Sequence, residues 1–455
     1  MAERIPANFR RVITAAAGGN VIEWYDFYIF GSLATILAVK FFEKSHPIAA
    51  LLSTIALFTI GFLVRPLGAF LFGWLGDRVG RKYTFILTLV GMALGTGAIG
   101  LIPTFDQIGL AAAFILFALR MIQGLCLGGS YGGAITYVAE HVPENRRGYY
   151  TGWLQTSPTL GIVLSMIIII ATRTYAGEKV FNDWAWRIPF LCSFALLLVT
   201  MYMRRNFEES PVYAEIKAKG KTSKNPWREA FLNPANLKYV VIASIVVLGE
   251  GVVWYSSQFW ALFYLLTVVK VDTLTANWVI GVGLVIGTPT LIFWGWISDM
   301  IGRKPVILGG FVLAAVTYYP LYTWLGTVAQ PGTIALGNGN YWTAVLIVAI
   351  MVNYVGMVYG PIGAFLAEFF PGRIRYTSVS MPYMIGNGWG GGLVPIVTVA
   401  AYQSAVAAGS SMNAAVGYAL IYPIAVPAIC FILSLFLMPE TKTRSIWEET
   451  APAKA

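Results

Sequence analysis

The sequence is poor in the residues on which soluble enzymes rely. Only 11% of its 455 residues are charged, and it contains 2 histidines and 3 cysteines. A soluble domain carries about a quarter charged residues and about half apolar ones, whereas 57% of this chain is hydrophobic and its mean hydropathy is +0.69. This composition excludes a water-soluble enzyme and a disordered chain. It predicts a protein that crosses a membrane many times.

The few histidines and cysteines show no spacing that would build a metal site. His46 and His141 have no ligand partners nearby, and Cys126, Cys192 and Cys430 all lie in apolar segments. No nucleotide-binding loop and no catalytic histidine motif occurs either. We therefore expect no metal, no cofactor and no enzyme activity.

The apolar runs are long enough for twelve spanning helices, each of which needs about 20 mostly apolar residues. The predicted spans are 12–39, 48–72, 83–102, 108–138, 150–171, 187–203, 239–266, 275–297, 305–325, 341–370, 377–404 and 414–437. The one long polar connection, 204–238, holds eight Lys or Arg and four Glu. The sequence thus predicts an all-α membrane protein with six-helix bundles at 1–203 and 239–455, joined by a cytoplasmic linker at 204–238.

The distribution of basic residues predicts the orientation in the membrane. If both termini are cytoplasmic, 23 of the 31 Lys and Arg lie inside, six lie in outer loops and two lie at membrane depth. Cytoplasmic loops carry such an excess in membrane proteins. The net charge of +10 then reflects topology and requires no nucleic-acid partner. We expect a multi-pass protein of the cell membrane with both termini in the cytoplasm.

The two halves of the chain contain an internal repeat. GWLGDRVGRK at 73–82 matches GWISDMIGRK at 295–304 in six of ten positions, at an offset of 222 residues. Two more matches follow in the same order: Glu140, Pro143 and Arg147 with Glu368, Pro371 and Arg375, then Glu209-Ser210 with Glu440-Thr441. Because the matching segments lie on one side of the membrane, the halves are predicted to be parallel repeats related by an axis along the membrane normal.

Several segments resemble the major facilitator superfamily and, within it, the metabolite:proton symporter family. These segments are NVIEWYDFYIFG at 20–31, RPLGAFLFGWLGDRVGRK at 65–82, RMIQG at 120–124 with GGSYGGA at 128–134, FFPGRIRYTSVS at 369–380 and PETK at 439–442. The resemblance covers essentially the whole chain. It implies two pseudo-symmetric six-helix bundles that rock around a central site, and cotransport of a small polar metabolite with protons. Ser130 departs from the pattern, since related sequences usually carry Glu there.

Five ionisable residues lie at membrane depth, where each is costly without a buried partner or an aqueous cavity. They are Glu23, Asp26, Arg65, Arg120 and Glu250. The spacing of Asn20, Glu23 and Asp26 predicts a polar stripe on the first helix, and Arg120, Gln123 and Tyr131 share a face of the fourth.

Asp26 and Arg120 are the predicted proton-coupling pair. A carboxylate in low-dielectric surroundings holds its proton more tightly, and a nearby guanidinium opposes this effect. Protonation of Asp26 would release Arg120 to bind a substrate carboxylate in bidentate fashion. A permanent structural salt bridge between the two helices is the alternative interpretation. Glu23 is either a second proton site or a structural partner of Arg65 or of the backbone.

The remaining candidate substrate ligands lie mostly in the second half. They are Trp254, Tyr255 and Gln258 in the seventh helix, Asn353 in the tenth, and Tyr383 and Asn387 in the eleventh, together with Asn20, Arg120, Gln123 and Tyr131. For any single aromatic residue, packing or a lipid-facing position is an equally simple interpretation. Glu250 has three open interpretations: it receives a cationic group, carries a proton, or contacts water near the outer mouth. Arg65 is expected to extend to the interface or to pair structurally.

The repeated loops predict a gate at the cytoplasmic side. Asp77 is expected to cap a helix N-terminus in one conformation and to release it in another. The predicted gate residues are Asp77, Arg78, Arg81, Glu140, Arg147, Asp299, Arg303, Glu368 and Arg375. The alternative is that the basic loops only fix the topology.

Together these patterns favour a proton-coupled symporter of a small organic acid or zwitterion, working as a monomer in the lipid bilayer. The alternatives are a uniporter or exchanger of a polar metabolite, an integral-membrane enzyme, and a channel or non-transporting sensor.

Overall fold

The computed structural model describes residues 9–42, 57, 60–204 and 208–447. All regular structure within these ranges is helical, and no strand occurs among them. Helices suit an apolar chain because each one satisfies its own backbone hydrogen bonds inside a bilayer. The all-α fold class is therefore confirmed.

Ten described helical segments are long and apolar enough to cross a membrane, or up to twelve if each of two bent pairs is one span. The ten are Ile60–Arg78, Arg81–Ile99, Leu110–His141, Glu144–Ala176, Pro234–Val269, Thr273–Ile301, Arg303–Val328, Gly339–Phe369, Gly372–Ala407 and Met412–Leu437. The bent pairs are Ile13–Ser32 with Ala34–Phe41, at 63°, and Glu178–Ala185 with Arg187–Met203, at 64°. Each of the twelve predicted spans overlaps one of these segments or pairs. The first part of the predicted second span, 48–56 with 58–59, lies outside the described residues, as does His46.

The chain divides into two compact units. Unit 1 comprises 1–141, 157–230 and 372–381, and unit 2 comprises 142–156, 231–371 and 382–455. The units share most of their residues with the two halves of the internal repeat. In addition, unit 1 takes in the start of the Gly372–Ala407 span, and unit 2 takes in the start of the Glu144–Ala176 span.

Unit 1 is organised around two helices, each of which packs against two neighbours. α1 (Phe9–Ser32) packs against α9 (Ser157–Ala176) and α11 (Arg187–Arg204), whereas α7 (Leu110–His141) contacts both α4 (Arg65–Arg78) and α5 (Arg81–Ile99). Gly128 permits the close approach of α7 to α4, because a Cβ there would lie 2.0 Å from the carbonyl oxygen of Arg65. Small residues at helix contacts are typical of membrane bundles.

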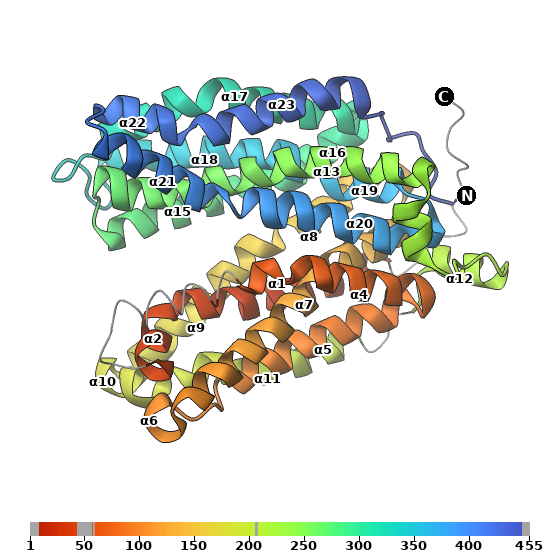
Figure 1. Ribbon diagram of the computed structural model, residues 1–455, viewed down its shortest axis with the longest axis horizontal. Coiled ribbons are helices and arrows are strands. Elements are labelled where there is room, and N and C mark those ends of the chain that lie inside the picture. The colour runs from red at the N-terminus through yellow and green to blue at the C-terminus, as the bar shows by residue number, and fades with distance from the viewer. Residues whose placement is uncertain (1–8, 43–56, 58–59, 205–207, 448–455) are drawn as a thin grey trace. The chain divides into compact units, whose positions relative to one another are not determined.

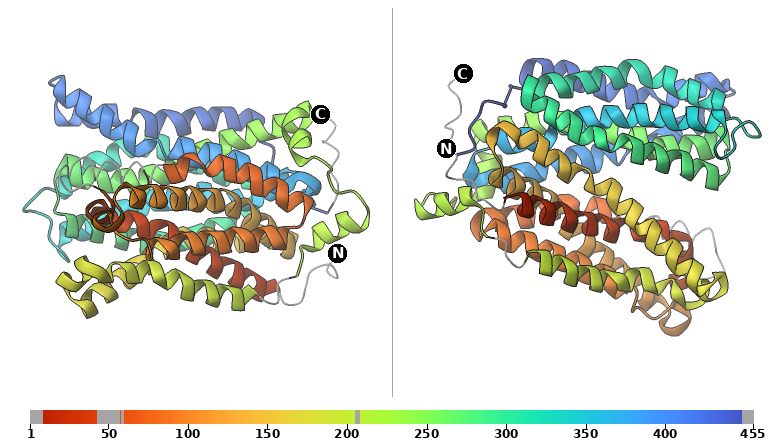
Figure 2. Two further views of the ribbon diagram at one scale, coloured as in Figure 1. Left: turned by 60° about the horizontal axis from the view of Figure 1, so that its bottom comes forward. Right: turned by 180° about the vertical axis from the view of Figure 1, so that it is seen from behind.

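Unit 2 is centred on α13 (Pro234–Tyr255). This helix packs against α23 (Ile421–Leu437) and η8 (Met384–Gly391), a π-helical stretch that follows α20 (Arg375–Tyr383). The other helices of the bundle are α15 (Thr273–Gly287), α16 (Pro289–Ile301), α17 (Arg303–Val328), α18 (Gly339–Tyr359), α19 (Ile362–Phe369), α21 (Val394–Ala407) and α22 (Met412–Ala419). Figures 1 and 2 show α17, α18 and α23 running alongside one another.

Many large apolar side chains lie on the outside of the bundles. Phe114 and Leu198 in unit 1 are 71% and 72% exposed, and Val316 in unit 2 is 69% exposed. Large exposed apolar patches are rare on soluble monomers. This surface suits contact with hydrocarbon tails.

Candidate functional site

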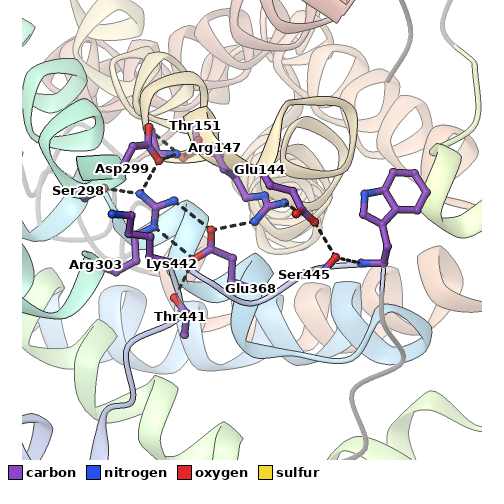
Figure 3. A network of polar contacts seen from close by, with 12 residues as sticks. Glu144, Arg147, Thr151, Ser298, Asp299, Arg303, Glu368, Thr441, Lys442 and Ser445 are labelled. Atoms are coloured by element: carbon purple, nitrogen blue, oxygen red, sulfur yellow. Dashed lines mark hydrogen bonds and ion pairs between the residues drawn. The ribbon is translucent and has the colours of Figure 1, made fainter. Parts of the chain in front are cut away.

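A network of buried charges joins α17, α19 and the start of α8 (Arg147–Gln155) in unit 2 (Figure 3). The carboxylate of Glu368 accepts hydrogen bonds from Arg303 Nε and Nη2 at 3.2 and 3.0 Å. It also accepts one from Arg147 Nη1 at 2.9 Å. Both guanidiniums are fully buried, so Glu368 is the carboxylate that they share.

Asp299 completes this network at the end of α16. Its oxygens accept hydrogen bonds from the backbone N–H groups of Gly148 and Tyr149 at 2.8 and 2.7 Å. Arg303 Nη1 also donates to Asp299 at 2.6 Å. A carboxylate is favourable at a helix N-terminus, where unpaired N–H groups and the helix dipole are positive. Asp299 therefore caps α8.

Unit 1 contains the counterpart of this network. Glu140 accepts hydrogen bonds from Arg81 and from Arg375, all three being buried. Asp77 accepts from the backbone N–H groups of Tyr376 and Thr377, at 3.2 and 2.8 Å, and so caps α20. Each residue of this network has an equivalent in unit 2. Asp77 and Arg81 correspond to Asp299 and Arg303 at an offset of 222 residues, and Glu140 and Arg375 correspond to Glu368 and Arg147 at an offset of 228.

Arg78 is the predicted gate residue that the structure leaves outside these contacts. Its side chain is exposed, and its guanidinium lies 5.0 Å from the centroid of the Trp74 ring. The other eight predicted gate residues meet in the two networks, four in each unit: Asp77, Arg81, Glu140 and Arg375, then Arg147, Asp299, Arg303 and Glu368.

Two further carboxylates belong to the networks and were not among the predicted site residues. Glu209 accepts from the backbone N–H groups at the start of α5, at 3.1 and 3.2 Å, and Glu440 does the same at the start of α17, at 2.9 and 3.0 Å. The residues that follow, Ser210 and Thr441, donate their hydroxyls to Glu140 and Glu368. The third repeat pair in the sequence was the signal that could have identified them.

Tyr213 also contacts the network of unit 1, and nothing in the sequence indicated this contact. It lies on α12 (Pro211–Ala218), outside the membrane-spanning segments, and donates its hydroxyl to the carbonyl oxygen of Arg78 at 3.0 Å. The Arg81 guanidinium lies 5.4 Å from its ring centroid. Burial raises the pKa of Tyr213 above its ordinary value.

The two networks differ at one repeat position. Ser298 in unit 2 accepts a hydrogen bond from Arg303 Nη1 at 2.7 Å, whereas the equivalent residue in unit 1 is Gly76. A Cβ at Gly76 would lie 2.3 Å from the ring of Tyr376. The aromatic ring thus fills in unit 1 the space that a hydroxyl fills in unit 2.

A separate polar group lies deep inside unit 1, on α1. Asp26 is 1% exposed and accepts a hydrogen bond from the hydroxyl of Ser193 on α11, at 2.5 Å. Asn20, two turns earlier, donates to Ser157 on α9. Glu23 lies between them on the helix and is 1% exposed. The predicted polar stripe of α1 is therefore buried within the bundle.

Arg120 lies on the neighbouring helix α7 and is fully buried. Its Nη1 donates to Gln123 Oε1 at 2.8 Å, and Gln123 Nε2 donates to Thr96 on α5 at 2.6 Å. Its guanidinium carbon lies 5.0 Å from the ring centroid of Phe27, the residue after Asp26. Asp26 and Arg120 thus come from adjacent helices, but their hydrogen bonds go to different partners.

Arg65 does not extend to the interface as one interpretation of the sequence expected. It is 2% exposed, and its guanidinium carbon lies 4.0 and 4.4 Å from the ring centroids of Phe62 and Phe27. Phe27 therefore lies within cation–π distance of both buried arginines, Arg65 and Arg120.

The candidate Tyr131 and the neighbouring Ser130 lie further along α7. Tyr131 is 3% exposed, and the Ser130 hydroxyl donates to the carbonyl oxygen of Leu127 at 3.2 Å in its own helix. At the position where the sequence departs from the expected family pattern, this chain therefore has a short side chain that bonds within its own helix.

The candidates of unit 2 fall into separate groups. Asn387 donates to both carboxylate oxygens of Glu250, whereas the half-buried Asn353 accepts from the indole N–H of Trp294 at 2.8 Å. The hydroxyl of Tyr383 lies 3.0 Å from that of Tyr359.

An aromatic wall is present at the end of α13. The rings of Trp254, Tyr255 and Phe259 lie with their centroids 4.8 to 5.7 Å apart. The adjacent Gln258 is 4% exposed, and its Oε1 accepts no hydrogen bond within the part of the chain that the structure describes.

Comparison with known proteins decides the family. The profile of the Major Facilitator Superfamily matches residues 16–395. The chain belongs to this superfamily. It is 30% identical to the inner membrane metabolite transport protein YhjE of Escherichia coli K12, over 98% of this chain and 97% of that protein. It is also 30% identical to the citrate-proton symporter of Salmonella typhi, over 88% of this chain and 90% of that protein.

A solved structure of the proton:xylose symporter XylE, bound to 6-bromo-6-deoxy-D-glucose, shares the fold. It superposes with a TM-score of 0.76 at 17% identity and covers 97% of this chain and 98% of that one. The predicted family and the major facilitator fold are thereby confirmed. The protein is a multi-pass membrane transporter and not an enzyme.

Proposed function

We propose that the protein is a proton-coupled symporter of a small organic acid or zwitterion that works by alternating access. The observation that carries this proposal is the buried Asp26 on α1, beside a helix that presents the buried Arg120. Ionisable groups inside membrane bundles are expensive and commonly mark ion and proton pathways.

The contacts of Asp26 suit a group that gains and loses a proton. Its hydrogen-bond partner is the hydroxyl of Ser193, which donates to the ionised carboxylate and can accept from the protonated acid. Arg120 on the adjacent helix donates to Gln123, and its guanidinium is the group proposed to bind an anionic substrate. Coupling between the acid and the guanidinium then links proton binding to substrate binding.

The charge of unit 1 favours a substrate with a carboxylate. Arg65 and Arg120 are both buried and both lie against Phe27. Arginine binds carboxylates in bidentate fashion, so either guanidinium suits such a ligand. In unit 2, Gln258 and the ring of Trp254 offer a hydrogen-bond acceptor and an aromatic face.

The two charge networks are the proposed gate. Each ends in an aspartate cap, Asp77 or Asp299, which depends on the exact position of a helix start. Small shifts of α20 or α8 would break the caps together with the ion pairs. The networks would then be made in one state of the transport cycle and broken in another.

The basic loops support the proposed orientation, with both termini in the cytoplasm of the cell. The protein is proposed to act as a monomer, because residues of a single chain complete every contact of both networks.

Uptake into proteoliposomes tests this function. The purified protein would be given radiolabelled carboxylates and zwitterions, including citrate, proline and betaine, with the outside more acidic than the inside. We expect one compound to accumulate above its external concentration, and a proton ionophore to abolish that accumulation. Uptake that ignores the ionophore would instead identify a uniporter or exchanger.

A further inference from the structure

We propose that Glu250 on α13 is a second proton-binding site of the transporter, separate from the acidic residues of α1. This inference rests on the proposed proton coupling and extends it to unit 2. Glu250 is fully buried in the middle of a membrane-spanning segment, and Asn387 Nδ2 donates to its two oxygens at 3.2 and 3.1 Å.

Among the described residues, no cationic side chain is hydrogen-bonded or ion-paired to Glu250, whose oxygens both accept from Asn387. The helices η5 (Ser256–Trp260), α18, η8, α21 and α23, all packed against α13, include no charged residue in their sequences. The titratable groups on the elements around this part of α13 are tyrosines and one cysteine, which are neutral at pH 7. They are Tyr255, Tyr318, Tyr319, Tyr322, Tyr341, Tyr354, Tyr359, Tyr402, Tyr422 and Cys430.

Two further helices packed against α13, α17 and α19, do carry charged residues at their ends, but these residues lie away from Glu250. α19 carries Glu368 and contacts α13 near its start, where the ring of Tyr239 lies 4.9 Å from that of Phe369. Glu250 follows Tyr239 by three turns of helix. At the start of α17, Arg303 is bound to Glu368, and Lys304 donates to the carbonyl oxygen of Leu435. The buried carboxyl of Glu250 therefore has an amide as its polar partner and no ion-pair partner among the described residues.

An amide partner suits a site that changes its protonation state. The Nδ2 of Asn387 donates to the ionised carboxylate, and its Oδ1 accepts from the protonated acid if the amide rotates. An arginine in the same place would hold the carboxylate ionised, because it can only donate. Glu250 can thus gain or lose a proton and keep a hydrogen bond in both states.

The backbone around the pair permits such an adjustment. Asn387 lies in η8, a π-helical run through four glycines, and π-helical turns are frequent at functional sites. Gly251 and Gly386 let the two elements touch: a Cβ at Gly251 would lie 2.6 Å from the Cα of Asn387. The close contact excludes water from the carboxyl group, while the π-helical run tolerates local shifts of register.

Infrared spectroscopy tests this site without a transported substrate. The purified full-length protein in liposomes would be titrated with pH, and the carbonyl band of protonated carboxylic acids recorded in difference spectra. We expect Glu250→Gln to remove one titrating band. Asp26→Asn is the matched control, which should leave that band in place and alter a different one.

The Glu250→Gln side chain is isosteric and can still pair with Asn387, so the variant should fold. Asn387→Ala provides an independent readout: it should shift the frequency of the Glu250 band, because the acid loses its hydrogen-bond partner. An unchanged set of titrating bands in Glu250→Gln would overturn the proposal, since Glu250 would then keep one protonation state. Such a result would not affect the proposed coupling role of Asp26, because the Asp26→Asn variant tests that role separately.

Discussion

Asp77 and Asp299 stand 222 residues apart and have the same hydrogen-bond partners in repeat-equivalent positions. Each accepts from two consecutive backbone N–H groups in the first turn of a helix, α20 for Asp77 and α8 for Asp299. In both cases the capped helix starts with an arginine, Arg375 or Arg147, that binds a buried glutamate. The cap and the ion pair therefore hold the same turn from two sides.

Removal of the cap charge should loosen the first turn of α8. In Asp299→Asn, loss of the negative charge at the helix N-terminus costs about 1–2 kcal/mol of local stability in this partly buried geometry. The amides of Gly148 and Tyr149 should then exchange hydrogen about five- to thirtyfold faster. Hydrogen–deuterium exchange measures this effect, with Asp183→Asn, an exposed aspartate, as the control. Equal exchange in both variants would show that the cap does not stabilise this turn.

Glu368→Gln should destabilise unit 2 strongly. The substitution leaves Arg303 and Arg147 buried without their shared carboxylate, and breaking a buried ion pair costs about 3–5 kcal/mol. Thermal unfolding in detergent should therefore show a clearly lower Tm. Glu144→Gln is the matched control, because Glu144 is partly exposed and lies 3.8 Å from Arg147. A drop of similar size in both variants would contradict the role assigned to Glu368.

The fold and the charge networks were largely predictable from the sequence, for a physical reason. Spanning helices follow from apolar length, and repeated motifs mark equivalent positions in two related halves. The offset between Glu140 and Glu368 therefore predicted two similar environments, and eight of the nine proposed gate residues lie in them. Arg78 does not, because the motif alone cannot say which of two nearby arginines points inward.

The partners of the buried carboxyls were not predictable. Ser193 lies on a helix far from Asp26 in the sequence, and serine hydroxyls are common in membrane helices as packing residues. Asn387 was noted only as a substrate candidate, and nothing in its local pattern pointed to Glu250. Such pairs depend on which helices pack together, and that information lies in the tertiary structure.

Asp26→Asn should abolish substrate accumulation but retain substrate exchange across the membrane. Asparagine cannot bind and release a proton, so transport driven by a pH gradient should be lost, whereas exchange of labelled for unlabelled substrate should remain measurable. Both assays use the same proteoliposomes and the substrate identified by the uptake screen. Asp183→Asn serves as the control and should accumulate substrate normally. Full accumulation by Asp26→Asn would remove this residue from the coupling role.

Arg120→Lys should also impair transport, although the positive charge is kept. Lysine lacks the planar fork that binds a carboxylate and Gln123 at once. We expect at least a tenfold lower apparent affinity for the substrate, about 1.4 kcal/mol, measured from uptake rates over a range of concentrations. Arg78→Lys, at an exposed position, should behave like the wild type. If Arg120→Lys does so as well, charge alone is sufficient at this position.

The two networks are equivalent by the internal repeat but differ at one position, Gly76 in unit 1 and Ser298 in unit 2. Each network can therefore serve as a reference for the other. Any substitution in one network can be compared with the equivalent substitution in the other network. The two variants would be measured in the same lipid, at the same temperature and at the same expression level. Matching phenotypes of equivalent variants in the two networks would show that both networks contribute equally to transport. Equivalent variants that diverge would show which network has specialised, and the serine hydroxyl beside Arg303 is the first chemical difference to which such a divergence could be traced.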